Sequence, residues 1–303
     1  MCGFGCRFFG NGLFPARKLT FDAQIMTRNA GGDAGKQRSM TLACQTVATR
    51  KAKGGPLPVN IRDQAMLFSR INNRLTNNQG FALATLNLDH LVKMSMSEVF
   101  RQAYTKQDLV VADGNPIVWL MWLAGQKTAL MPGSDLVKPL ADLAAKAGVS
   151  VALVGSTDAT LNRAAEVLQR DIPGLNIACR IAPEFGFDPS GASADAVIKD
   201  IETSGARLVF LALGAPKQEV FAAHARDVLP NVGLVSIGAG LDFLAGSQKR
   251  APRLVRAFAL EWAWRLLSNP RRLGLRYLYC ALILPGHALT AIRLRRSPAD
   301  ITP

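Results

Sequence analysis

The sequence predicts an α/β fold: a Rossmann-like, mostly parallel sheet with helices on both faces, followed by an Arg-rich amphipathic helical C-terminal appendage. Two observations predict the sheet. Six short, nearly continuous apolar segments of strand length recur between residues 81 and 237, and segments with helical spacing separate them. Strands that are buried on both faces are apolar throughout, and strands that alternate with helices form parallel sheets.

The elements follow in order from residue 59. Apolar residues at helical spacing, as in Ile61–Leu75, predict helices, and short runs such as FALATL predict buried strands. The predicted strands are Phe81–Leu86, Leu109–Ala112, Val149–Val154, Asn176–Ile181, Leu208–Leu213 and Leu234–Ile237. The predicted helices are Ile61–Leu75, Asp89–Lys106, Ile117–Ala124, Leu136–Ala147, Asp158–Gln169, Ser193–Ser204 and Gln218–Val228. Several strands end in small or polar residues, and open α/β sheets bind ligands at these carboxyl ends.

Composition and charge divide the chain into three parts. The 303 residues are 49% hydrophobic and 19% charged, which excludes wholesale disorder, and the net charge is +14. Residues 1–55 hold 9 Lys and Arg against 2 acidic residues, and residues 249–296 hold 11 against 1. The central part, 56–248, is slightly acidic. Basic ends on an ordinary globular body indicate a polyanionic partner, either nucleic acid or an anionic membrane face.

The two basic ends carry different expectations. Residues 1–55 lack periodicity and are predicted to be a disordered extension, with a mis-assigned start (Met26 or Met40) and a basic targeting or membrane-contact tail as alternatives. No long apolar region follows Arg7, so a secretory signal is not expected. Five cysteines without zinc-ligand spacing favour a reducing cytosol over a disulfide or metal scaffold.

The C-terminal part, residues 249–303, interleaves arginines with apolar and aromatic residues. An apolar stripe that includes Phe258 and Trp262 is typical of a helix at a membrane interface. The alternative is a helix that packs on its own sheet and covers apolar surface with Arg stems. The apolar stretch Tyr277–Ile292 is interrupted by Pro285, Gly286 and His287, so no conventional spanning helix is expected.

Chemistry is expected at the strand ends. Asp113 directly follows a strand in an Asp-Gly-Asn-Pro turn, where it is either a catalytic carboxylate or a helix cap. Asn87 follows another strand and either binds a sugar hydroxyl or closes a turn. The turn 214–219 opens a helix whose first N–H groups can receive phosphate oxygens. No P-loop or Gly-x-Ser-x-Gly motif occurs, and the three histidines share no metal spacing.

Taken together, these segments resemble the WecG/TagA/CpsF glycosyltransferases, family 26. The resemblance covers about residues 58–280 and rests on seven blocks in the family's order. The blocks are Thr85–His90, Asp113-Gly114 with Trp119, Gly133–Leu136, Gly214–Glu219, Gly238–Phe243 with Ala245-Gly246, Arg250–Pro252 with Leu260–Trp262 and Arg265-Leu266, and Asn269–Arg272 with Arg276-Tyr277.

The resemblance implies an inverting, metal-independent transferase that needs no cofactor. It would move a sugar from UDP to a polyprenyl-diphosphate-linked glycan at the cytoplasmic membrane face, in cell-surface polysaccharide synthesis. Asp113 matches the family's general base, and Thr85, Asn87 and Gln218 match its substrate pocket. We assign the nucleotide side to the strand-end and helix-start residues Gly155, Gly214, Lys217, Glu219, Gly238, Gly240 and Asp242.

One departure from the family concerns the diphosphate. Leu130 stands where the family often has an Arg, so either an appendage arginine (Arg265, Arg271 or Arg272) binds the diphosphate in its place or the acceptor geometry differs. Two other classes of function are alternatives. A nucleic-acid-binding protein would use the basic ends, but these interleave with apolar residues. An NAD-linked oxidoreductase is disfavoured because Gly238-Ala239-Gly240 lacks the third glycine of the dinucleotide motif.

Overall fold

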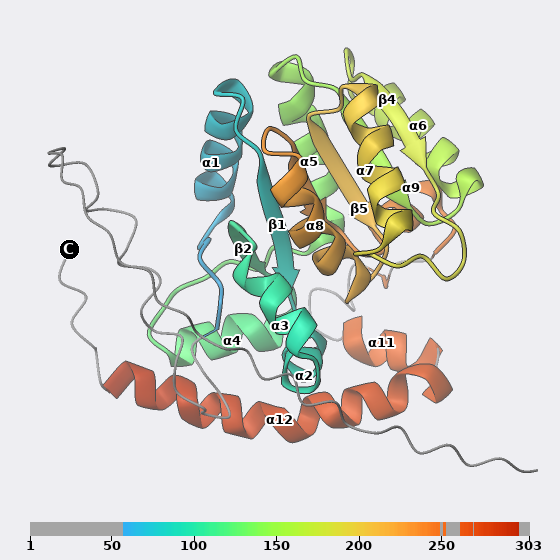
Figure 1. Cartoon of the computed structure of the whole chain (residues 1–303). Helices are drawn as coiled ribbons and strands as arrows, with labels where there is room; N and C mark the ends of the chain where they lie inside the picture. Colours follow the sequence, from blue (N-terminus) through green and yellow to red (C-terminus); the bar gives the residue numbers. More distant parts are fainter. Residues whose placement is uncertain (1–56, 249–250, 253–260, 269, 297–303) are drawn as a thin grey trace, which may run out of the picture. The chain divides into compact units, whose positions relative to one another are not determined.

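The computed structural model describes residues 57–248, 251–252, 261–268 and 270–296. It contains one parallel six-stranded sheet with the strand order β2-β1-β6-β5-β3-β4 (Figure 1). The strands are β1 (Phe81–Leu86), β2 (Leu109–Ala112), β3 (Val151–Gly155), β4 (Ile177–Ile181), β5 (Leu208–Ala212) and β6 (Gly233–Ser236). The predicted α/β class and all six predicted strands are therefore confirmed. The extension predicted for residues 1–55 lies outside the described residues.

Helices cover both faces of the sheet (Figure 1). Successive strand residues point to opposite faces, so Leu153 and Phe210 belong to one core cluster and Val154 and Leu211 to another. The first face is covered by α1 (Gln64–Thr76), α5 (Gly133–Lys146), α6 (Asp158–Asp171) and α9 (Gly240–Ala245). The second face is covered by α2 (Leu88–Met96), α3 (Glu98–Thr105), α4 (Asn115–Leu123), α7 (Ala192–Ser204) and α8 (Lys217–Val228).

The segment 89–106, predicted as one helix, is two helices. Ser97 has an extended backbone between α2 and α3, and its hydroxyl accepts the N–H of Phe100 at 3.3 Å. Serine competes with the helix by bonding to nearby backbone groups, which favours caps over helix interiors. The hydrophobic spacing alone did not reveal this cap.

The C-terminal segment contains α11 (Glu261–Ser268) and α12 (Pro270–Arg296). The predicted interruption at Pro285 was wrong, because α12 runs through this residue. Ile283, Leu284 and Ala288 pack against the core cluster of α4, which offsets the hydrogen bond that proline cannot donate. By length and composition alone, residues 273–296 could cross a membrane, and 11% of the 18-residue window that meets this criterion is buried. Phe258 of the predicted stripe lies outside the described residues, whereas Trp262 lies in α11 and is half-exposed.

Candidate active site

At the carboxyl edge of the sheet, several neighbouring strands lead to helices on opposite faces. β1 leads to α2 while the adjacent β6 leads to α9, and β5 leads to α8 while the adjacent β3 leads to α6. Such switch points are where open α/β sheets bind ligands. The predicted site residues lie at the ends of these strands, so the topology gathers them along one edge.

Asp113 lies at the carboxyl edge of the sheet, immediately after the edge strand β2 and next to the end of β1. Its N–H donates to the carbonyl of Leu86 at 2.7 Å, which joins the ends of β2 and β1. The cap of α4 is Gly114, whose φ of 111° suits glycine. Gly114, and not Asp113, therefore occupies the cap position of α4; the cap was the structural alternative for the Asp113 carboxylate. Its side chain is half-buried at the strand end.

Thr85 and Asn87 lie on either side of Leu86, the last residue of β1, and the side chain of each makes a hydrogen bond within the fold. The Asn87 side-chain oxygen accepts the N–H of His90 at 3.1 Å and caps α2. Thr85 is buried, and its hydroxyl donates to the carbonyl of Ser236 in β6 at 3.4 Å. Both residues hold the strand ends next to Asp113. Their predicted role in binding substrate remains a prediction.

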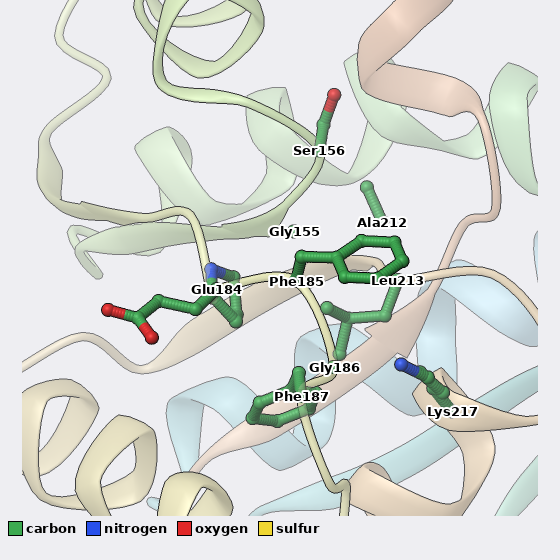
Figure 2. A pocket seen from close by; sticks show the side chains of 10 residues that line it. Gly155, Ser156, Glu184, Phe185, Gly186, Phe187, Ala212, Leu213 and Lys217 are labelled. Atoms are coloured by element: carbon green, nitrogen blue, oxygen red, sulfur yellow. The ribbon is translucent and has the colours of Figure 1, made fainter. Parts of the chain in front are cut away.

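A pocket of about 380 Å³ lies at one of these switch points, between the ends of β3 and β5 (Figure 2). The predicted residues Gly155 and Lys217 line it, together with Phe185 and Phe187 from the loop after β4. Phe185 is fully exposed, and Figure 2 shows the Glu184 carboxylate directed away from the Lys217 amine. Neither phenylalanine was among the residues predicted from the sequence. The sequence feature that could have identified them is their position on either side of Gly186 in the loop after a predicted strand.

At this edge of the sheet, glycines allow neighbouring segments to approach one another closely. Gly155 has a φ of 113°, and a Cβ on it would lie 2.5 Å from the Ala212 carbonyl group. Ser156 then donates from its hydroxyl to Asp242 Oδ1 at 2.8 Å, which ties the β3 end to α9. Gly240 is a packing glycine, because a Cβ would meet Val137 at 2.9 Å. The β3 and β6 ends are thus held together on the pocket side.

Gln218 and Glu219 are buried side by side at the start of α8. The Gln218 amide nitrogen donates to Glu219 Oε1 at 2.8 Å, and its oxygen accepts the N–H of Gly238 at 3.1 Å. The Gln218 side chain therefore fastens the β6–α9 loop. Glu219 is 0% exposed, so its carboxylate supports Gln218 from beneath and does not line the pocket. The turn before α8 contains Gly214 at a φ of 71°.

Burial changes the protonation of this cluster. Desolvation raises the pKa of Glu219 from 4.5 to about 7, even though the Gln218 hydrogen bond favours the charged form. Burial and nearby Lys93 lower the pKa of His90 to about 3, so His90 is neutral although it lies 3.9 Å from Glu219. The His90 Nδ1 lies 2.6 Å from the Tyr104 hydroxyl, whose pKa is raised by burial and by Glu219 and Asp113.

The predicted diphosphate arginines are on the C-terminal helices. Arg271 is exposed in the first turn of α12, and the side chains of Arg265 and Arg272 lie outside the described residues. Leu130, which replaces the family arginine, is exposed before α5. In the described part of the chain, no group of three or more His, Cys, Asp or Glu side chains is placed to hold a metal ion.

An α/β sheet with a pocket and a strand-end carboxylate at its carboxyl edge is typical of enzymes that bind nucleotide-containing substrates. The model of the glycosyl transferase WecG/TagA/CpsF family matches residues 55–298, and the chain belongs to this family. It is therefore a hexosyltransferase. A similar protein is the N-acetylglucosaminyldiphosphoundecaprenol N-acetyl-beta-D-mannosaminyltransferase of Bacillus spizizenii, 30% identical over 200 residues, which cover 65% of this chain and 75% of the relative.

Proposed function

We propose that this enzyme transfers a sugar from a UDP-sugar to a polyprenyl-diphosphate-linked acceptor, with inversion, in cell-surface polysaccharide synthesis. Asp113 carries the proposal: it directly follows β2, its N–H donates to the Leu86 carbonyl at the end of β1, and Gly114 occupies the cap position of α4. The relative's name describes transfer of N-acetylmannosamine to a diphosphoundecaprenol-linked N-acetylglucosamine. We extend the acceptor class to this chain. Exopolysaccharide or capsule assembly is the proposed pathway.

The pocket at the β3–β5 edge is the proposed donor site. Its volume of about 380 Å³ falls within the range of small-molecule sites. The exposed ring of Phe185 offers a flat surface for a base, since aromatic rings stack on the face of any nucleobase. The Lys217 ammonium and the N-terminus of α8 supply positive charge for a diphosphate.

The reaction would proceed as a single displacement. Asp113 accepts the proton of the acceptor hydroxyl while the oxygen of that hydroxyl bonds to the anomeric carbon of the donor sugar. The bond from the anomeric carbon to the UDP oxygen breaks at the same time, with inversion at this carbon. The leaving diphosphate takes the electron pair. Lys217, the α8 N-terminus and the appendage arginines offset the developing charge, so this chain's own residues supply the electrostatic stabilisation and no metal is required.

The membrane face is the proposed place of this reaction. Exposed leucines line α12, among them Leu275, Leu278, Leu282 and Leu289, and Arg293, Arg295 and Arg296 close the helix. A helix with exposed apolar residues and terminal arginines suits an anionic bilayer surface. We therefore propose peripheral association with the inner face of the plasma membrane. A nucleic-acid-binding protein without catalysis does not agree with the family.

The experiment is UDP release from a panel of UDP-sugars, with UDP-N-acetylmannosamine first, in the presence and absence of a polyprenyl-diphosphate-N-acetylglucosamine acceptor. Asp113→Asn is expected to retain the fold and to lower kcat by about 10²–10⁴-fold. Asp142→Asn removes a surface carboxylate that pairs with Lys146 and serves as the control. Near-wild-type turnover in Asp113→Asn would remove this residue from the mechanism, and no acceptor-dependent release from any donor would reject the proposed reaction.

A further inference from the structure

Asp89 joins the C-terminal helix to the catalytic core. It lies in the first turn of α2, and its side chain is only 9% exposed. Arg276 of α12 reaches Asp89 Oδ1 with its Nε at 2.7 Å, and Lys93 reaches Oδ2 with its Nζ at 2.7 Å. One nearly buried carboxylate therefore holds two cations, one from the C-terminal helix and one from α2.

Lys93 continues this chain of contacts to the proposed donor site. Its Nζ also donates to the backbone carbonyl of Ala215 at 3.0 Å. Ala215 lies in the turn between β5 and α8, two residues before Lys217, which lines the pocket. A continuous path of polar contacts thus runs from Arg276 through Asp89 and Lys93 to the turn at the pocket.

The burial of Asp89 makes these contacts interdependent. A carboxylate removed from water needs compensating charge, and loss of one cation leaves the other to satisfy both oxygens. Without Arg276, Lys93 would therefore be drawn toward Asp89 and away from the neutral carbonyl of Ala215, because a charged acceptor binds an ammonium more strongly than a carbonyl does. The position of the pocket turn consequently depends on the docking of α12.

We propose that Asp89 is a positioning residue, which holds the Ala215–Lys217 turn in its catalytic place through Lys93 only while Arg276 of α12 is docked on it. The proposal rests on the proposed transferase function. The substrate groups that benefit are the diphosphate oxygens of the donor, since Lys217 follows the turn. Asp89 itself touches no substrate and acts through Lys93.

The experiment compares Arg276→Gln, Lys93→Met, the double variant and Asp89→Asn in the full chain. Asp171→Asn is the matched control, because Asp171 also pairs with two cations, Lys138 and Arg170, on an exposed surface. Hydrogen exchange of the peptide 213–219 is measured without substrates. The kcat and KM values are measured with the donor that the UDP-sugar panel identifies. Circular dichroism verifies that each variant is folded.

We expect Arg276→Gln to accelerate exchange at 213–219, although Arg276 is not in that turn, and to lower kcat by about five- to tenfold with the acceptor KM unchanged. The double variant should resemble Lys93→Met alone, since both substitutions break one path. Unchanged exchange at 213–219 in Arg276→Gln, additive effects on kcat, or an Asp89→Asn variant as active as Asp171→Asn would each overturn the proposal. Absence of wild-type turnover would instead defeat the proposed function, while the exchange measurement still tests the link.

Discussion

Replacing Glu219 by Gln is expected to change how the stability of the protein depends on pH. The side chain is fully buried, and burial raises its pKa in the folded protein from 4.5 to about 7. Between these values the folded protein holds a proton that the unfolded chain has lost. The contribution of Glu219 to the free energy of unfolding is therefore full below pH 4.5 and is lost as the pH rises to 7.

The magnitude follows from the size of the pKa change. One pKa unit corresponds to about 1.4 kcal/mol, so the change from 4.5 to about 7 corresponds to about 3 kcal/mol. Glutamine keeps the shape of the side chain and an oxygen that can accept the Gln218 amide, but it does not titrate. The free energy of unfolding of the wild type, minus that of Glu219→Gln, should thus fall by about 3 kcal/mol between pH 4 and pH 8.

Urea unfolding at several pH values, followed by circular dichroism, measures this difference. His90 titrates in both proteins, so its effect cancels to first order when the two are subtracted. The carboxylates that remain exposed cancel in the same way. A difference that stays constant from pH 4 to pH 8 would show that Glu219 is ionised at its usual pKa in the folded state, and would refute the argument from burial.

Two further predictions follow from the sheet edge and from α12. Gly155→Ala should lower the free energy of unfolding by about 2–5 kcal/mol, because a Cβ would lie 2.5 Å from the Ala212 carbonyl and φ is 113°. The control is Gly174→Ala, where φ is 78° and the space is open, and it should lower the free energy of unfolding by about 1–2 kcal/mol in the same urea titration. Equal losses in the two variants would contradict the close approach at Gly155. Removal of all residues after Gly246 should abolish co-sedimentation with vesicles of phosphatidylcholine and phosphatidylglycerol and abolish turnover, whereas unchanged co-sedimentation would reject a membrane role for the C-terminal helices.

The sequence was a good guide where structure depends on local pattern. The six strands are short, apolar and separated by helical spacing, and the structure contains all of them. The turn after β2 was also identified, because an Asp-Gly-Asn-Pro sequence marks a strand-to-helix transition. The helix predictions failed where a single residue and the hydrophobic pattern around it indicate different structures. Ser97 caps a second helix inside a continuous apolar pattern, and Pro285 is tolerated inside α12.

From the sequence, the site was predicted as a set of residues at strand ends. The order of the elements along the chain predicts these positions but not the directions of their side chains. Gly155 and Lys217 line the pocket, but Phe185 and Phe187 were not identified, because an exposed loop has no periodicity to reveal its direction. Glu219 was predicted beside the nucleotide and lies beneath Gln218 with no exposed surface. Only the packing of α8 against α3 shows which face of α8 is buried.

The sequence by itself determined the α/β class, the strands and the edge of the sheet where ligands bind, because each of these follows from the local hydrophobic pattern and the order of the elements along the chain. The tertiary structure decided which polar side chains are structural and which face a pocket. The Arg276–Asp89 pair joins residues 187 positions apart, and the Gln218–Gly238 bond joins a helix to a loop. Such contacts depend on how helices pack across the sheet, which hydrophobic spacing does not specify.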